Sequence, residues 1–68
     1  MIHVIHMNGR VFRANTQRAN GAFRDFFEAS CEDFPKSYEF APSRSGALEL
    51  LKDSMGRELA KQRPQQGA

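Results

Sequence analysis

The chain has 68 residues, 40% of them hydrophobic, and carries a formal net charge of +2 at pH 7. This length allows one small domain and no more, and such a domain buries only about 60% of the surface of its unfolded chain. The hydrophobic content, which includes six Phe, excludes a disordered chain, and no apolar stretch approaches the roughly 20 residues of a membrane span.

The cysteine content limits the class of protein further. The single cysteine, Cys31, excludes an intramolecular disulfide and a cysteine-rich zinc module. A lone thiol is typical of a reducing compartment, so we expect a cytoplasmic protein. We expect one α+β domain over residues 1–63 and a disordered tail at residues 64–68, which have nothing to bury.

The pair Asn8-Gly9 predicts a β-hairpin at the start of the chain. A two-residue type I′ turn needs positive φ at both central positions, which Asn and Gly tolerate best. The flanking runs, residues 2–7 and 10–14, are rich in β-branched and aromatic residues, as strands are. The turn predicts a register that pairs Met7 with Arg10, His6 with Val11, Ile5 with Phe12 and Val4 with Arg13.

This register distributes the hairpin side chains over two faces. One face receives Met1, His3, Ile5, Met7, Arg10, Phe12 and Ala14. The other face receives Ile2, Val4, His6, Val11, Arg13 and Asn15. Because both faces keep several apolar residues, the second face is expected either to be covered within the fold or to form a contact surface.

The next segment, up to Pro35, has apolar residues at helical spacing and predicts a first helix. Thr16 and Asn20 are candidate N-caps, and Gly21 favours a start at Asn20. Pro35 would end the helix, because the residue before a proline is driven out of the α region. The predicted apolar stripe contains Ala19, Phe23, Phe26, Phe27, Ser30, Cys31 and Phe34.

Residues 37–41 predict a short strand before Pro42, with Tyr38 and Phe40 on one face and Glu39 on the other. A final helix follows, with Ser43 and Ser45 as candidate N-caps. Its apolar stripe contains Ala47, Leu48, Leu51, Met55 and Leu59, and Leu50 lies off this stripe. The expected order is therefore β-β-α-β-α: a two-layer α+β domain with a three-stranded sheet packed by two helices.

No catalytic, cofactor or metal site is predicted. His3 and His6 lie on opposite faces of one strand, and with Cys31 they make at most an incomplete metal site. Cys31 lies beside the apolar stripe of the first predicted helix, where a thiol is an ordinary core residue rather than a nucleophile. We therefore expect no enzyme activity and no cofactor.

Two further groups of residues have a structural and a functional interpretation. Carboxylates spaced along the first predicted helix are typical of a solvated face, or of a docking patch for a basic partner. Four Phe on its stripe are typical of a small core, although spare apolar surface would favour a partner. The carboxylates are Asp25, Glu28, Glu32 and Asp33, and the aromatic residues are Phe23, Phe26, Phe27 and Phe34.

The charges are segregated along the chain: residues 1–24 are basic and residues 25–39 are mainly acidic. The basic start makes the hairpin the best candidate for partner binding, through protein contacts or through the backbone of a nucleic acid. Arg10 and Arg13 are expected on opposite faces of the hairpin, so they do not form one basic stripe. The predicted partner-binding residues are Arg10, Arg13, Arg18, Arg24, His6 and Val4.

From the sequence we expect a small non-enzymatic binding protein that acts through protein–protein contacts. In size and style it resembles inhibitors of host complexes encoded by phages and other mobile elements, anti-CRISPR proteins among them, but no residue motif carries this likeness. The alternative is a nucleic-acid-binding regulator that uses the basic hairpin through Arg10, Arg13 and Arg18. A third interpretation is a homodimer that pairs through edge strands.

Overall fold

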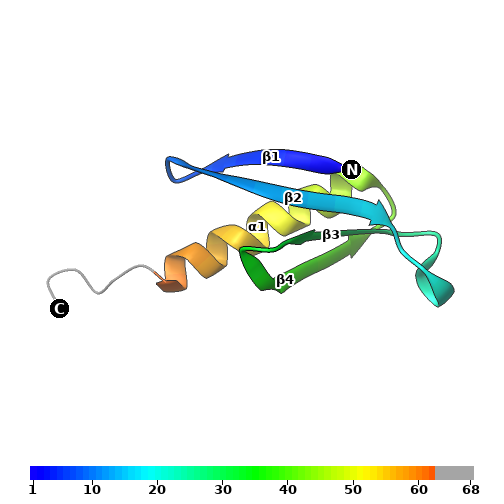
Figure 1. Ribbon diagram of the computed structural model, residues 1–68. Helices are drawn as coiled ribbons and strands as arrows, with labels where there is room; N and C mark the ends of the chain where they lie inside the picture. The colour runs from blue at the N-terminus through cyan, green and yellow to red at the C-terminus, as the bar shows by residue number, and fades with distance from the viewer. Residues whose placement is uncertain (63–68) are drawn as a thin grey trace, which may run out of the picture.

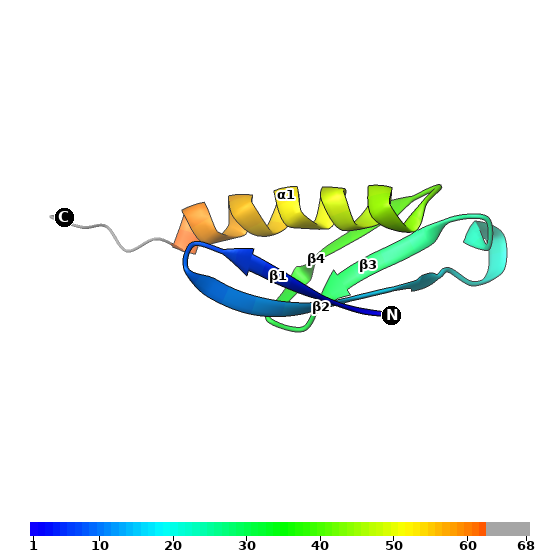
Figure 2. The ribbon, with the colours of Figure 1, turned by 90° about the horizontal axis from the view of Figure 1, so that it is seen from above.

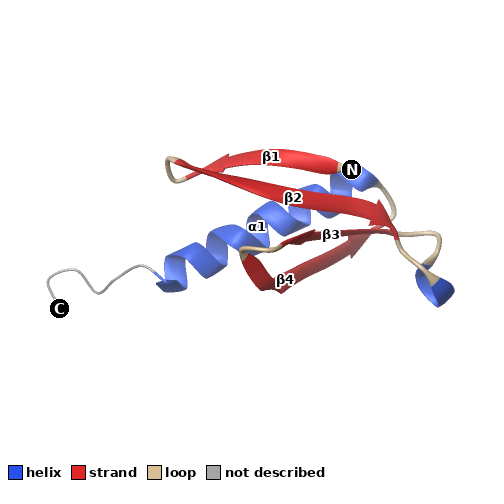
Figure 3. Cartoon of the chain, in the orientation of Figure 1, coloured by secondary structure: helices blue, strands red, loops and turns tan. Residues whose placement is uncertain are grey.

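A computed structural model describes residues 1–62, which form a four-stranded antiparallel sheet and one long helix (Figures 1 and 3). The strands lie in the order β1-β2-β3-β4, so each strand pairs with its neighbour in the chain. The helix α1 lies along one face of the sheet (Figure 2). The elements are β1 (Ile2–Met7), β2 (Arg10–Arg18), the 3-10 helix η1 (Gly21–Phe23), β3 (Phe27–Cys31), β4 (Phe34–Ala41) and α1 (Arg44–Gln62).

The predicted hairpin is confirmed in its position and in its register. Asn8 and Gly9 have φ values of 54° and 73°, as a type I′ turn requires. Met7 pairs with Arg10 and Val4 with Arg13, as predicted, and the pairing continues to Ile2 and Asn15. Neither residue of the turn enters the core, so the reversal is a local property of these two residues.

The predicted fold class is wrong in the middle of the chain, where the order is β-β-β-β-α and not β-β-α-β-α. The segment predicted as the first helix forms η1, β3 and the start of β4 instead. Phe27, Ala29 and Cys31 alternate with the polar residues Glu28 and Ser30, which is the period of a half-buried strand. The strand prevails over the helix because β3 pairs on both sides, with β2 and with β4.

The predicted boundaries of the missing helix have other roles. Thr16 is not an N-cap but a fully buried residue of β2. Asn20 precedes η1 and makes no side-chain capping bond. Pro35 lies inside β4, which begins three residues before the predicted strand at residues 37–41 and ends with it. Because β4 is an edge strand, the missing N–H of Pro35 is tolerated there.

The predicted final helix is confirmed as α1. Ser43 is its N-cap, because its Oγ accepts a hydrogen bond of 3.0 Å from the backbone N–H of Gly46. Leu50 is exposed, as expected from its place off the stripe. Among the stripe residues, Leu48 is partly buried and packs against the core, and the buried ones are Ala47, Leu51, Met55 and Leu59.

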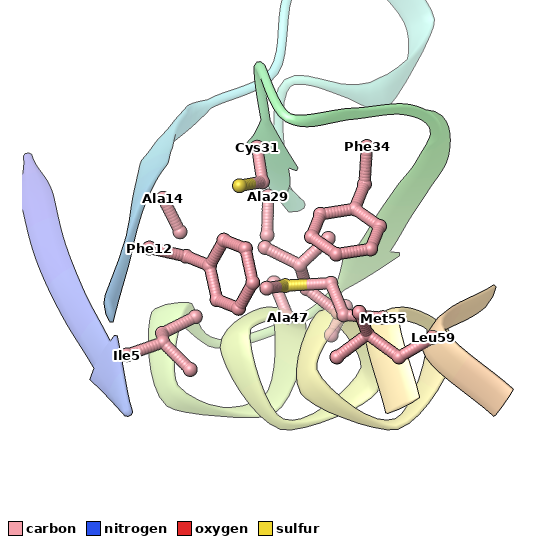
Figure 4. Packing of buried hydrophobic residues seen from close by; sticks show 11 residues of the cluster. Ile5, Phe12, Ala14, Ala29, Cys31, Phe34, Ala47, Met55 and Leu59 are labelled. Atoms are coloured by element: carbon pink, nitrogen blue, oxygen red, sulfur yellow. The ribbon is translucent and has the colours of Figure 1, made fainter. Parts of the chain in front are cut away.

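The core lies between α1 and the sheet face that it covers (Figure 4). Phe12 of β2 and Phe34 of β4 meet edge to face, with ring centroids 5.0 Å apart. Small residues of the central strands, Ala14 and Ala29, leave room for these rings and for Met55 of the helix. Helix α1 covers only this face of the sheet, and no element within residues 1–62 covers the second face.

The described part of the chain ends at residue 62. The predicted domain boundary at residue 63 and the predicted disordered tail at residues 64–68 lie outside it. Within residues 1–62, no helix combines the length and the apolar character that crossing a membrane would need.

Candidate functional site

The face of the sheet away from α1 is the most distinctive surface of the molecule, and we call it the open face. Side chains alternate between the two faces of a strand, so the residues next to the buried core positions point to this side. All four strands contribute to it. The open face contains Ile2, Val4 and His6 of β1, Val11, Arg13, Asn15 and Gln17 of β2, Glu28 and Ser30 of β3, and Tyr38 and Phe40 of β4.

A chain of hydrogen bonds crosses the open face from the N-terminus, beside β1, to β4. The amino group of Met1 donates to Asn15 Oδ1 over 3.2 Å, and Asn15 Nδ2 donates to Gln17 Oε1 over 3.2 Å. Gln17 Nε2 donates to one oxygen of Glu28, and Tyr38 Oη donates to the other oxygen over 2.5 Å. These polar side chains therefore hold one another in place across the sheet.

Apolar side chains lie on both sides of this polar row. Ile2, Val4 and Val11 are well exposed at the β1 side, and we call them the aliphatic patch. At the β4 side, the rings of Tyr38 and Phe40 lie 5.2 Å apart. The ring of Phe23, from η1, lies 5.5 Å from that of Phe40 and completes an exposed aromatic patch of Phe23, Tyr38 and Phe40.

An open hollow of about 440 Å³ lies beside Ile2 of the aliphatic patch and next to the turn that joins β3 to β4. It offers Arg13 and Glu32 as charged groups, with Ile2 and Pro35 as apolar walls. Because one cation and one carboxylate face the same space, the hollow can accept both a donor and an acceptor from a partner.

The predicted partner-binding residues do not gather on one surface. Val4, His6 and Arg13 lie on the open face. Arg10 and Arg18 lie on the side of α1, where their guanidinium groups sit 4.9 Å above the ring of Phe12 and 4.8 Å above that of Phe27. The backbone oxygen of the remaining residue, Arg24, accepts a hydrogen bond from Arg18.

The aliphatic patch was predicted on one hairpin face, and Tyr38 with Phe40 on one face of their strand, but Phe23, which completes the aromatic patch, was predicted in the core of a helix. Phe34 is buried and Phe27 is partly buried, but Phe23 and Phe26 are exposed. The signal for the open face is the alternation at the end of β4, where Ser37 is buried, Tyr38 exposed and Glu39 partly buried. A sheet with one covering helix must leave such alternating residues exposed.

The other candidate residues have structural surroundings. His3 is partly buried on the side of α1, and its Nε2 lies 2.7 Å from Thr16 Oγ1. Cys31 is a free, buried core residue, as expected. Within residues 1–62, no three His, Cys, Asp or Glu side chains come together in a way that could hold a metal ion.

The carboxylates predicted to line one side of a helix are instead spread over several strands and loops. Glu28 lies on the open face, Glu32 and Asp33 form the turn between β3 and β4, and Asp25 lies between η1 and β3. They form neither a single solvated helix face nor one acidic patch.

One titratable group of the open face is perturbed. The hydrogen bond to the Glu28 carboxylate raises the pKa of Tyr38 above its ordinary value of 10.0, and partial desolvation and the negative charge of Glu28 act in the same direction. The Tyr38 hydroxyl therefore stays protonated at neutral pH and can donate this hydrogen bond.

No protein-family model matches this chain, and neither the curated proteins nor the solved structures contain a match to it.

Proposed function

We propose that this protein is a non-enzymatic binding protein whose open face docks on a partner protein. The observation that carries this proposal is the position of the exposed apolar residues: aliphatic and aromatic patches lie on the one sheet face that α1 leaves uncovered. Exposed apolar patches bordered by polar side chains are typical of protein–protein interfaces. The ordered polar row between the patches provides hydrogen bonds with fixed directions, which favours a specific partner.

Nucleic-acid binding is the second candidate, favoured by the exposed aromatic patch, since bases stack on such rings. The distribution of charge argues against it. Residues 1–42 carry five cations and five carboxylates, a net charge of zero (5 − 5 = 0). Because Arg10 and Arg18 lie on the other side of the sheet from Arg13, these arginines form no basic stripe that could follow a phosphate backbone.

The site of action that we propose is the cytoplasm, in agreement with the free thiol of Cys31. A phage- or mobile-element-encoded inhibitor of a host complex is one kind of protein that would bind in this way. That role stays a prediction from the length and general organisation of the chain.

Affinity capture from a lysate, with and without nuclease, tests the proposal when it is combined with matched variants. Val11→Ser with Phe40→Ser removes one residue from each patch of the open face. Leu50→Ser removes an equally apolar, exposed residue of α1 and serves as the control. We expect a stoichiometric protein partner that survives nuclease, is retained by Leu50→Ser and is lost with the double variant.

The salt dependence of the isolated complex separates the two candidates. A protein complex held by the apolar patches should lose little affinity as salt rises. A partner that disappears with nuclease, together with a steep loss of affinity in salt and on Arg13→Ala, would contradict the proposal and support nucleic-acid binding.

A further inference from the structure

The two edges of the sheet differ in how they are protected against pairing with another strand. The edge strand β4 contains Pro35 and Lys36, is followed by Pro42, and has a register irregularity opposite Ser30 and Cys31. Proline, lysine and bulges are the usual devices that block an edge. The other edge strand, β1, has the sequence IHVIHM and contains no proline, glycine, lysine, arginine or carboxylate.

The backbone groups that β1 presents outward follow from its pairing with β2. Met1 and Thr16 exchange two backbone hydrogen bonds, so this is a hydrogen-bonded pair. In an antiparallel ladder such pairs alternate with pairs that do not exchange hydrogen bonds. The N–H and C=O groups of Ile2, Val4 and His6 therefore point away from β2, along an edge where these three side chains are exposed.

We propose that β1 pairs antiparallel with β1 of a second copy of this chain, about a two-fold axis at Val4. The pairing joins the two sheets into one continuous eight-stranded sheet. Each outward residue then exchanges both of its backbone hydrogen bonds with the copy: Val4 with Val4, Ile2 with His6, and His6 with Ile2.

The occupant that fits this edge best is the chain itself, because β1 is self-complementary. A two-fold axis places each residue opposite a residue of the same strand, so a charged strand would oppose its own charges. β1 has none of the four charged residue types, and the pairs at the axis are apolar with apolar or apolar with His. The helix does not block the approach, since its main contacts are with β2, β3 and β4.

The exposed side chains of β1 also gain contacts where the two copies of β1 pair. A two-fold axis perpendicular to the sheet keeps both open faces on the same side. The exposed side chains of Ile2 and Val4 from the two copies then meet near the axis, whereas Val11 lies one strand away, in β2. Because a strand of this length contributes an interface at the small end of specific interfaces, we expect a reversible monomer–dimer equilibrium rather than an obligate dimer.

Sedimentation over micromolar to millimolar concentrations measures this equilibrium, and Val4 and Val11 provide matched variants. Their exposed fractions are 60% and 59% and both lie on the open face, but only Val4 lies on the edge. We expect Val4→Lys to weaken the dimer by about tenfold or more, because two like charges meet at the axis, and Val11→Lys to leave it much less changed.

A charge-swap mixture tests the two-fold register directly. Val4→Lys and Val4→Glu should each be mainly monomeric, with the circular dichroism of the wild type, and should form a heterodimer when they are mixed. A wild-type chain that stays monomeric at every concentration would overturn the proposal, and so would an equal effect of Val11→Lys or the absence of a heterodimer. Sedimentation of the purified chain does not depend on a partner protein, so the dimer proposal can be contradicted while the proposed docking of the open face stands, and the reverse.

Discussion

Tyr38 donates a hydrogen bond of 2.5 Å to Glu28 diagonally across the β3–β4 pair, on the uncovered face of the sheet. Loss of the Tyr38 proton would break this bond and leave two negative charges side by side, so the pKa of Tyr38 is raised above 10.0. Because the folded-state pKa is the raised one, the stabilisation from this bond is complete below about pH 10 and disappears as the pH rises through the folded-state pKa.

The ultraviolet absorbance of tyrosinate measures this pKa without interference, because Tyr38 is the single tyrosine and the chain has no tryptophan. We expect Glu28→Gln to lower the pKa of Tyr38 toward 10.0, since the carboxylate charge and its strong acceptor are lost together. The control is Glu39→Gln, which lies in β4 next to Tyr38 but on the other face of the sheet, and it should leave the titration of Tyr38 unchanged. An unchanged titration in Glu28→Gln would show that the bond does not form in solution.

Replacing Phe12 by Ala should cost about 3–5 kcal/mol of unfolding free energy, because Phe12 is 2% exposed and packs on Phe34. At about 0.05–0.15 kcal/mol per residue, a domain of this size has a total stability of only about 3–10 kcal/mol. The loss is therefore a large fraction of the total stability, and the variant should unfold at a much lower urea concentration than the wild type. Urea unfolding measures the loss, and Val11→Ala, on the exposed face, should change stability by about 0.5 kcal/mol or less.

Two glycines should respond to Ala in opposite directions. Gly9→Ala should destabilise the fold by about 1–2 kcal/mol, because its φ of 73° is costly for any residue with a Cβ. Gly56→Ala should stabilise it by up to about 1 kcal/mol, because the position is helical. Within the described residues, an added Cβ has no neighbour within 4 Å at either site, so the difference is conformational. Thermal unfolding that moves both variants in the same direction would contradict the assigned turn.

The hydroxyl groups of Ser37 and Ser54 form one hydrogen bond of 3.0 Å between β4 and α1. Ser37 is 2% exposed, so Ser54→Ala leaves its hydroxyl buried without this partner and should cost about 1–3 kcal/mol. The double substitution Ser37→Ala with Ser54→Ala should cost less unfolding free energy than Ser54→Ala alone, because no hydroxyl is then left without a partner. A double-mutant cycle by urea unfolding checks the difference, and additive effects of the two substitutions would show that the bond contributes nothing.

The segment from Asn20 to Phe34 shows where the sequence interpretation failed. Its apolar residues fit a helical stripe, and the same residues fit a strand in which Ala29 and Cys31 face the core and Glu28 faces solvent. A short segment can satisfy both periods, and local propensity does not choose between them. The choice depends on β2 and β4, which supply hydrogen bonds to both edges of β3.

By itself the sequence determined the two elements whose causes are local. Asn8 and Gly9 accept positive φ and set the register of the first hairpin, and Ser43 caps a helix whose apolar stripe follows it. The tertiary structure decided which apolar side chains became core and which became surface. One helix can cover only one face of a four-stranded sheet, so Phe12 is buried while Val4 and Tyr38 face outward.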